Sequence, residues 1–234
     1  RLSLVGSEMC IRDRSTADID DVLADPDIDI VDICLPPAMH VPVAIRVLET
    51  GKHAIVEKPV AGSLVEADQL IAAEARSHGS LFPVFQYRYG KAFDQLATLR
   101  AAGLPGRPVA ATIETHWSRD KQYYANLWRG SWNHELGGAV LIHAIHAHDL
   151  LTQHFGAVAD VAAVLTTNAN PVETEDCAAI SLRMANGSLA TSSITLGAAT
   201  DTTRLRFVYE HLTAESGTAP YAPGIGEWLS LIHI

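Results

Sequence analysis

Residues 28–85 alternate between short apolar runs and helical patterns, and this alternation limits the folds open to the chain. The predicted strands are 28–35, 53–56 and 81–85, and the predicted helices are 18–23, 41–50 and 63–79. Strands that alternate with helices in this way form a parallel α/β sheet. We expect the strand at 53–56 to be buried on both faces, because it is a continuous apolar run.

Signals at the helix ends support this assignment. Ser15 or Thr16 can cap the first helix, and Gly51 follows the second as a C-cap. Ser63 and Glu66 have the spacing of a capping box at the start of the third helix. The predicted apolar stripe of that helix comprises Leu64, Ala67, Leu70, Ile71 and Ala75.

The pattern changes in the second half of the chain. Leu104-Pro105-Gly106 is a turn that we interpret as a domain junction. The predicted elements are helices at 92–102 and 136–155, a polar and aromatic loop at 118–133, and strands at 109–117, 158–166, 176–184, 188–196 and 203–211. Asn186-Gly187 predicts a hairpin, since Asn-Gly supplies two residues with positive φ. The second half is therefore predicted to be α+β, with a largely antiparallel sheet backed by helices.

Composition excludes several classes of partner. The 234 residues are 48% hydrophobic and carry a net charge of −10 with no basic block, so nucleic acids and anionic membranes are poor partners. No apolar run reaches the roughly 18 residues needed to span a bilayer. The cysteines at positions 10, 34 and 177 lack metal-ligand spacing and cannot all pair, which favours a reduced, cytoplasmic setting.

Both ends of the chain have unusual sequences. Residues 1–14 (RLSLVGSEMCIRDR) have neither helical nor strand period, and residues 229–234 (LSLIHI) follow Trp228 abruptly. We interpret both as non-native tails, because similar strings arise from translated sequencing adapters. The alternative is a genuine pair of unusual tails.

The glycine signature of a dinucleotide site is missing. Such a sheet opens with G-x-G-x-x-G at its first strand–helix turn. The nearest string here, Gly224-Ile225-Gly226, lies outside any strand–helix pattern. A missing βαβ unit of about 30 or more residues before the first strand would explain the gap, and these 234 residues would then be inactive by themselves. The alternative is that the chain binds no dinucleotide.

The stretch Gly51–Val60 (GKHAIVEKPV) places a lysine where a ligand would lie. Ligands of open parallel sheets bind outside the carboxyl ends of the strands, and Glu57 and Lys58 directly follow the strand at 53–56. Pro59 biases Lys58 toward an extended conformation, which aims its side chain. The alternative is an ordinary surface lysine in a loop.

Two segments carry a family resemblance. Residues 31–61 (VDICLPPAMHVPVAIRVLETGKHAIVEKPVA) resemble the carboxyl half of the Rossmann domain in Gfo/Idh/MocA oxidoreductases, with G-K-H before the strand and E-K-P after it. Residues 137–149 (GGAVLIHAIHAHD) are similar to the family's G-G … D-x-x-x-H-x-x-D segment, and Arg88-Tyr89 resembles its Arg-aromatic pair. The resemblance implies half of a Rossmann NAD(P)-binding domain at 15–88 and an incomplete α+β substrate and oligomerisation domain at 89–228.

The resemblance implies an NAD- or NADP-dependent oxidoreductase that acts on a CH–OH group of a sugar, inositol or related polyol. The resemblance implies that Lys58, the E-K-P lysine, lies next to the nicotinamide and the substrate hydroxyl, and that His146, the helix histidine, is its catalytic acid/base partner. Asp149 matches the family's trailing aspartate and, with His143, completes the expected catalytic residues. Because His146 and Asp149 are three residues apart on a helix, we expect Asp149 to hold the imidazole tautomer. The family's acidic residue falls on Ile142, and His143 beside it is the candidate replacement.

The remaining candidate site residues follow from their positions after the predicted strands and around the aromatic loop, together with the resemblance. Those expected to contact the cofactor are Pro36, Pro37, His40, Glu57, Lys58, Pro59 and Gln86. Those expected to contact the substrate are Arg88, Trp117, Trp128, Arg129 and His143. Arg88 has a salt bridge at the domain junction as its alternative role, and the tryptophans have core packing. We also expect a homo-oligomer formed through the sheet of the second domain.

Two other classes of function stay open. A cofactor-bound sensor without turnover is suggested by Ile142 at the acidic position. A zinc hydrolase is suggested by the cluster of His134, His143, His146 and His148, but H-x-x-H-x-H is not a helical ligand spacing, so no metal site is predicted. We expect His148 and His154 to be structural or exposed.

Overall fold

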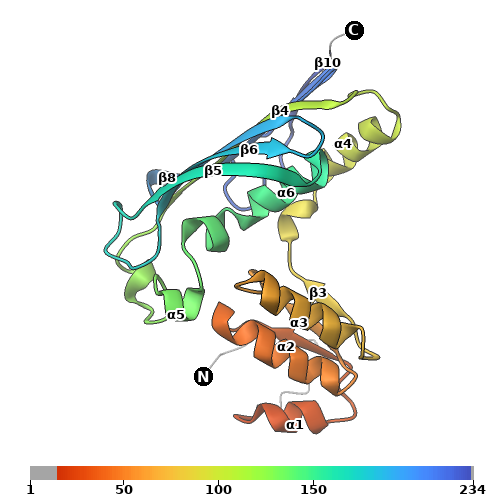
Figure 1. Ribbon diagram of the computed structural model, residues 1–234, viewed down its shortest axis with the longest axis vertical. Helices are drawn as coiled ribbons and strands as arrows, with labels where there is room; N and C mark the ends of the chain where they lie inside the picture. The colour runs from red at the N-terminus through yellow and green to blue at the C-terminus, as the bar shows by residue number, and fades with distance from the viewer. Residues whose placement is uncertain (1–14, 233–234) are drawn as a thin grey trace, which may run out of the picture.

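The computed structural model describes residues 15–232 and consists of two stacked parts (Figure 1). The smaller part is a three-stranded parallel sheet with helices, and the larger part is a seven-stranded, mostly antiparallel sheet with helices. This confirms the predicted fold class, a partial Rossmann sheet followed by an α+β domain. Among residues 15–232, the helices are too short or too polar to cross a bilayer.

The small sheet has the strand order β1-β2-β3. The elements of this part are α1 (Ile19–Ala24), β1 (Ile30–Ile33), the 3₁₀ turn η1 (Pro37–Met39), α2 (His40–Glu49), β2 (His53–Val56), α3 (Leu64–Glu74), β3 (Leu81–Pro83) and the 3₁₀ turn η2 (Gln86–Arg88). Ala54 and Val56 of β2 are fully buried in a cluster with α2 and α3. His53 and Ile55 point to the opposite face and are half-buried. The expected burial of β2 on both faces is therefore wrong for one face, because α2 packs on the other.

The N-terminal cap of α1 differs from the predicted one. Asp18, rather than Ser15 or Thr16, caps α1, since its carboxylate accepts the Asp20 N–H at 2.9 Å. An aspartate satisfies this orphan donor and also places negative charge at the positive end of the helix dipole. Ser63 caps α3 as predicted.

The apolar surface of the small part is incompletely covered. The predicted stripe of α3 is wrong in part: Leu70 is buried, whereas Leu64 is 85% and Ile71 64% exposed, because α3 packs along α2 over a narrow strip. Strand β1 is an edge strand in the described residues, and an apolar groove of about 910 Å³ runs between it and α1. Ile30 of β1 is 53% exposed.

The large sheet has the strand order β10-β9-β8-β4-β7-β6-β5. Its strands are β4 (Pro108–Ser118), β5 (Val158–Thr166), β6 (Cys177–Met184), β7 (Leu189–Thr195), β8 (Gly197–Tyr209), β9 (Leu212–Glu215) and β10 (Leu229–Ile232). All neighbours are antiparallel except β4 and β7, which are parallel. Buried and exposed residues alternate along β4 and β7, as expected for strands with one covered face.

Most strands of the large sheet were predicted, with three differences. Strands β9 and β10 were missed, and β10 falls in the stretch interpreted as a non-native tail, an interpretation that stays a prediction. Strand β8 begins at Gly197 instead of 203. The hairpin between β6 and β7 is present, but Gly187, at φ 87°, has positive φ and Asn186 does not.

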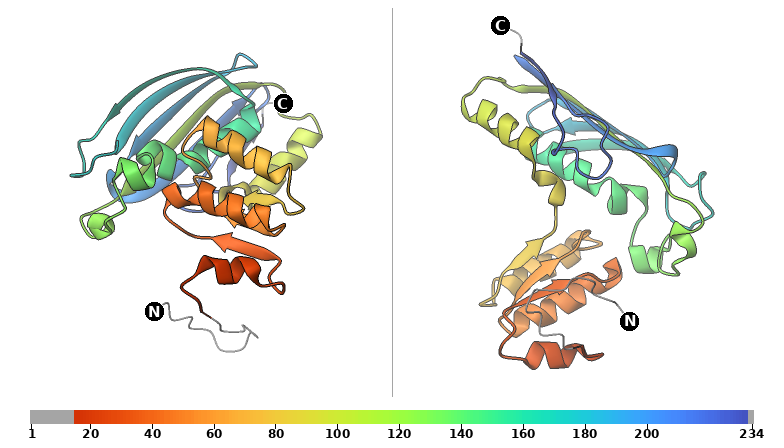
Figure 2. Two further views of the ribbon diagram at one scale, coloured as in Figure 1. Left: turned by 60° about the horizontal axis from the view of Figure 1, so that its bottom comes forward. Right: turned by 180° about the vertical axis from the view of Figure 1, so that it is seen from behind.

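Helices α4 (Lys91–Ala101) and α6 (Ile145–Phe155) lie on the face of the large sheet that is turned to the small part (Figure 2). Leu150 and Phe155 of α6 pack with Leu205 and Phe207 of β8 in the main core. The predicted helix at 136–155 is interrupted. Leu136 has a left-handed conformation with φ 67° and ends the short helix α5 (Trp132–Glu135), so no helix runs through it. The π-helical turn η4 (Ala139–His143) follows, and α6 begins only at Ile145.

Three buried histidines of α6 should make the folded protein less stable at acidic pH. Burial lowers the pKa of His146, His148 and His154 to about 4. The unfolded chain binds more protons than the folded chain between about pH 6.5 and about pH 4. We therefore expect the free energy of unfolding in urea to fall between about pH 7 and about pH 5, by about 1–2 kcal/mol per buried histidine.

Substitution separates this effect from other titrations. His148→Gln keeps a donor near Ser192, which lies 3.0 Å from His148 Nε2, and should reduce the pH slope. His134 is exposed, so His134→Gln should leave the slope unchanged. Equal slopes in the wild type and both variants would contradict the prediction.

Candidate active site

A cavity of about 330 Å³ lies where the two parts meet. Its lining residues are Cys34, Leu35, Pro37, Glu57, Lys58, Trp117, Arg119, Tyr123, Trp128, Arg129, Ile142 and His143. Cys34 and Glu57 directly follow the carboxyl ends of β1 and β2, which is where open parallel sheets bind ligands. The second part contributes the end of β4, the loop after it and the η4 turn.

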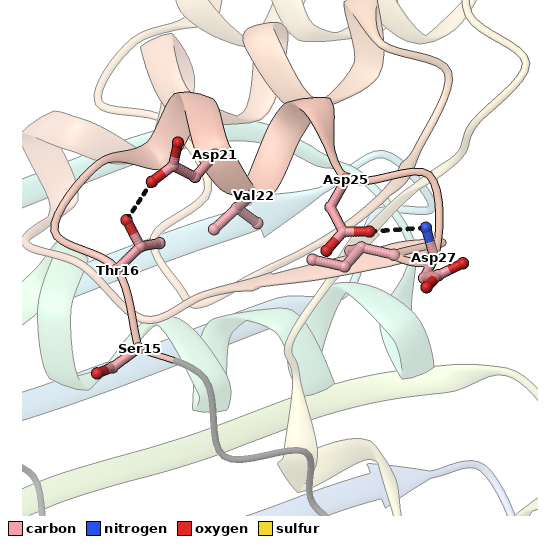
Figure 3. A pocket seen from close by; sticks show the side chains of 7 residues that line it. Ser15, Thr16, Asp21, Val22, Asp25 and Asp27 are labelled. Atoms are coloured by element: carbon pink, nitrogen blue, oxygen red, sulfur yellow. Dashed lines mark hydrogen bonds between the residues drawn. The ribbon is translucent and has the colours of Figure 1, made fainter.

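A larger hollow of about 620 Å³ lies beside α1 (Figure 3). There Thr16 donates a hydrogen bond to Asp21 at 2.6 Å, and Asp25 accepts the Asp27 N–H at 2.9 Å. Its lining contains no lysine, histidine or cysteine among the described residues. The cavity at Lys58 combines an amine, an imidazole and two guanidinium groups at the ends of parallel strands, so it is the better candidate for a catalytic site.

Lys58 is held at one end of the cavity by a main-chain acceptor. Its Nζ donates a hydrogen bond to the Ile142 carbonyl oxygen at 2.6 Å. Burial lowers the pKa of the Lys58 ammonium; Glu57 opposes this shift, and the charges of Arg129 and Arg119 add to it. The sequence predicted that this lysine is aimed at a ligand site, and the structure places it in the lining of the cavity.

The acceptor for Lys58 comes from position 142, where the family pattern has an acidic residue. The η4 turn brings the Ile142 carbonyl to Nζ, so the main chain supplies the polar partner that the Ile142 side chain lacks. Sequence reasoning missed this contact because every residue has a carbonyl group and no residue type marks its use.

The η4 turn is fixed by a buried glutamate that the sequence did not single out. The Glu175 carboxylate accepts the N–H groups of Gly138, at 3.0 and 3.1 Å, and Val140, at 3.1 Å, and the Glu175 carbonyl accepts the Ala139 N–H at 2.8 Å. A carboxylate at this end of a helical segment satisfies orphan donors and matches the helix dipole. A Cβ at Gly138 would lie 2.0 Å from the Glu175 carbonyl oxygen, so only glycine permits this approach.

His143 lies in the cavity lining beside aromatic residues. Its Nε2 is 3.0 Å from the Tyr123 hydroxyl, and its ring meets the Trp117 ring edge-on at 5.5 Å. Arg129 donates to the Tyr123 oxygen, which leaves the Tyr123 proton free to be donated to Nε2. Burial, together with Lys58, Arg119 and Arg129, lowers the pKa of His143 well below its usual value. The ring is therefore neutral near pH 7.

His146 lies behind the cavity rather than in its lining. Its ring stacks on Tyr87, with centroids 4.4 Å apart, and meets the edge of Phe85 at 6.0 Å. Its Nδ1 is buried without a hydrogen-bond partner in residues 15–232. The expectation that Asp149 holds this imidazole is wrong, because Asp149 is engaged by Arg88.

Arg88 forms the junction salt bridge and not a wall of the cavity. Its Nε and Nη2 donate to the two oxygens of Asp149 at 2.8 and 2.5 Å. A guanidinium that donates two parallel hydrogen bonds to a carboxylate binds it more strongly than a single imidazole N–H does. The salt-bridge alternative for Arg88 is thus the arrangement present, and it ties η2 to α6.

The residues expected at the cofactor separate into two groups. Pro37, Glu57 and Lys58 line the cavity. The others have different surroundings: Pro36 precedes η1, Pro59 is buried, Gln86 is exposed on η2, and His40 is buried with its two ring nitrogens 2.8 Å from the Pro59 carbonyl and 2.7 Å from the Leu35 carbonyl. The His40 ring thus lies between main-chain oxygens that follow β1 and β2, and it bridges the two strand ends.

The residues expected at the substrate are mostly in the cavity. Trp117 at the end of β4, Trp128 and Arg129 in the loop after it, and His143 on η4 line the cavity. The aromatic residues of the loop at 118–133, Tyr123 among them, indicated a loop over a site, but Arg119 in the same loop was not singled out. Within residues 15–232, histidine, cysteine and acidic side chains form no group of three able to hold a metal.

Family models match both parts of the chain. Residues 8–85 match the NAD-binding Rossmann fold of an oxidoreductase family, and residues 93–215 match the Gfo/Idh/MocA C-terminal domain. The chain belongs to the Gfo/Idh/MocA oxidoreductase family. The family prediction from the E-K-P stretch and the histidine helix is thereby confirmed.

Individual relatives cover most of the chain. The uncharacterized oxidoreductase YrbE of Bacillus subtilis is 34% identical over 181 residues, 75% of this chain and 51% of YrbE. Levoglucosan dehydrogenase of Pseudarthrobacter phenanthrenivorans is 31% identical over 157 residues, 66% of this chain and 40% of that enzyme. The WlbA dehydrogenase of Bordetella pertussis, solved with NADH and UDP-GlcNAcA, has a TM-score of 0.84 and 29% identity over 92% of this chain and 62% of WlbA. The chain thus spans about half the length of these curated relatives.

Gly138→Ala tests whether the η4 turn depends on the approach of Glu175. The added methyl group meets a backbone oxygen, so one of the two segments must shift, which costs about 1–3 kcal/mol. We expect the melting temperature to fall by at least about 3 °C. Gly226→Ala is the matched control, because a Cβ there has nothing within 4 Å. Equal melting temperatures for the two variants would contradict the prediction.

Proposed function

We propose that the protein transfers hydride between a nicotinamide cofactor and a CH–OH carbon of a sugar, inositol or related polyol. The observation that carries the proposal is the buried amine of Lys58 at the carboxyl end of a parallel strand, in a cavity of about 330 Å³ beside neutral His143. The proposal is supported by the family's NAD-binding Rossmann fold. It is also supported by the similarity to WlbA, which was solved with a sugar nucleotide, and to levoglucosan dehydrogenase.

The residues present suit the nicotinamide end of the cofactor. Leu35 and Pro37 give the cavity a rigid apolar side, and Glu57 and Lys58 give it polar groups at the strand ends. Residues 15–232 contain no G-x-G-x-x-G turn for the phosphates. We propose NAD rather than NADP, with support from the NADH in the WlbA complex. When bound, the nicotinamide supplies the carbon that accepts or returns the hydride.

Lys58 is the group that we propose takes the proton of the substrate hydroxyl. Its lowered pKa makes the neutral amine available at a lower pH than for lysine in water, and the Ile142 carbonyl keeps Nζ in place. In the reverse direction, the Lys58 ammonium stabilises the negative charge that develops on the carbonyl oxygen of the substrate and returns the proton to that oxygen. We propose that His143 contacts the substrate, that His146 supports proton exchange from behind Lys58, and that Asp149 acts by positioning Arg88.

A second copy of the chain is the partner that we propose for the outer face of the large sheet. In the described part of the chain, Figures 1 and 2 show no helix on this face. Its side chains on β4 and β7 include Thr112, Thr191 and Ser193, which are small and exposed. Small outward side chains such as these allow a second sheet to approach closely.

A second candidate function is a cofactor-bound sensor without turnover, favoured by the absence of a carboxylate at position 142. The two are separated by NADH absorbance with a panel of polyols. Turnover with any polyol supports the oxidoreductase. No change in NADH absorbance with any polyol, together with tight NADH binding, supports the sensor.

Lys58→Met in the whole protein is expected to abolish turnover and to preserve most of the cofactor binding. Methionine keeps the length and apolar stem of lysine but has no group to exchange a proton. We expect kcat to fall by at least about 100-fold, measured by NADH absorbance, while the Kd of NADH changes by less than about threefold. Activity close to that of the wild type would refute the assignment of Lys58.

Ile142→Asp is expected to shift the pH profile of turnover. A carboxylate beside Nζ favours the ammonium form, so the pKa of Lys58 should rise, and the limb of the kcat profile that reports it should move by about 1 unit or more toward alkaline pH. Ile142→Asn is the matched control, since it introduces a polar side chain of the same shape without charge. A profile that moves equally in both variants would show that charge is not the cause.

A further inference from the structure

The charged side chains that line the cavity are mainly hydrogen-bond donors. Lys58, Arg119 and Arg129 line it, and Glu57 is the one acidic residue in its described lining, which contains no asparagine or glutamine. Each hydroxyl of a neutral polyol donates as well as accepts, so a site for such a compound needs acceptors. This donor set instead matches a ligand that carries a negative charge.

Arg129 is held as a rigid planar donor. Its guanidinium carbon lies 4.1 Å from the centre of the Tyr123 ring and 4.3 Å from that of the Trp128 ring. Contact with two aromatic rings limits the freedom of the guanidinium and leaves its edges for hydrogen bonds in the plane. Arginine arranged in this way favours planar anionic groups such as carboxylates.

Arg119 approaches the same aromatic residue from another direction. Its guanidinium carbon lies 5.0 Å from the centre of the Tyr123 ring and 4.9 Å from that of Trp117. Its side chain is 12% exposed, and its Nε is buried without a hydrogen-bond partner in the described part of the chain. Nη1 already donates to the Ser118 carbonyl oxygen at 2.6 Å and to Asp201 at 3.2 Å. Nη2 has two N–H groups and, in the described part of the chain, only a 3.5 Å contact with the Tyr221 hydroxyl, so it is the donor that Arg119 can offer to a ligand.

The acidic partners of the two arginines stand outside the cavity lining. Asp201 lies 3.2 Å from Arg119 Nη1, and Glu135 lies 3.6 Å from Arg129 Nη1. Neither residue lines the cavity. The two carboxylates therefore reduce the net charge of the region without supplying acceptors to a bound ligand.

We infer that the substrate is an acidic sugar, a hexose-sized polyhydroxy compound whose anionic substituent is bound by Arg119 and Arg129. This inference rests on the proposed polyol site and specifies its substrate class. A carboxylate, as in a hexuronate, and a phosphate monoester share the required charge and acceptor oxygens. The aromatic rings of Trp117 and Trp128 then pack against the apolar faces of the sugar.

Ligand comparison on the wild-type chain tests the inference without any substitution. Trp117 and Trp128 line the cavity, so tryptophan fluorescence reports binding. Glucuronate, glucuronamide, glucose and glucose 6-phosphate are titrated separately. We expect glucuronate or glucose 6-phosphate to bind about tenfold or more tightly than glucuronamide and glucose, and the tighter of the two identifies the anion. Equal affinities for charged and neutral ligands would overturn the inference.

Two variants locate the effect in the cavity. Arg129→Lys keeps the charge but removes the planar fork, and should remove most of the preference for the anionic ligand. Arg107→Gln removes a positive charge from an exposed side chain outside the cavity lining, and should keep the preference. A preference that survives Arg129→Lys and is lost in Arg107→Gln would also overturn the assignment.

Turnover is measured separately on the same ligands with NAD, in the whole protein. Oxidation of neutral polyols without preferential binding of anions would leave the proposed function standing and refute the acidic substrate. Preferential binding of anions without turnover of any ligand would support the anion site and refute the proposed oxidoreductase function.

Discussion

The hydrogen bond from Lys58 Nζ to the Ile142 carbonyl joins the two parts of the molecule at the candidate site. One partner stands at the end of a parallel strand, and the other belongs to a π-helical turn 84 residues later. The turn has its shape because Glu175 binds its first N–H groups and Gly138 allows the close approach. The position of the reactive amine therefore depends on main-chain geometry in both parts.

Two of the three cationic side chains that line the cavity come from a single loop. Arg119 and Arg129 stand on either side of Tyr123, and their charges lower the pKa of both Lys58 and His143. The same cations that keep these two groups nearer their neutral forms also provide the donors for an anionic ligand. Electrostatic tuning of the proposed acid–base group and substrate selection are thus two effects of one arrangement.

The histidines of the second part have separate roles, although they are close in the sequence. His143 lies on the η4 turn in the cavity lining, whereas His146 packs on Tyr87 and His148 is bonded to Ser192. The change from π-helix to α-helix between His143 and Ile145 alters the direction of successive side chains. An assignment of faces that assumes one continuous α-helix cannot describe this segment.

The sequence by itself determined the alternation of strands and helices, the hairpin at Gly187 and the family, because periodicity, turn residues and the E-K-P stretch are local signals. It also identified Lys58, because a charged residue directly after a buried parallel strand lies at the edge of the sheet where ligands bind. Only the tertiary structure decided that Lys58 binds a carbonyl, that Asp149 binds Arg88 and that His146 stacks on Tyr87 outside the cavity lining. These contacts join segments distant in the chain and use main-chain atoms or competing side chains, which leave no pattern in the order of residues.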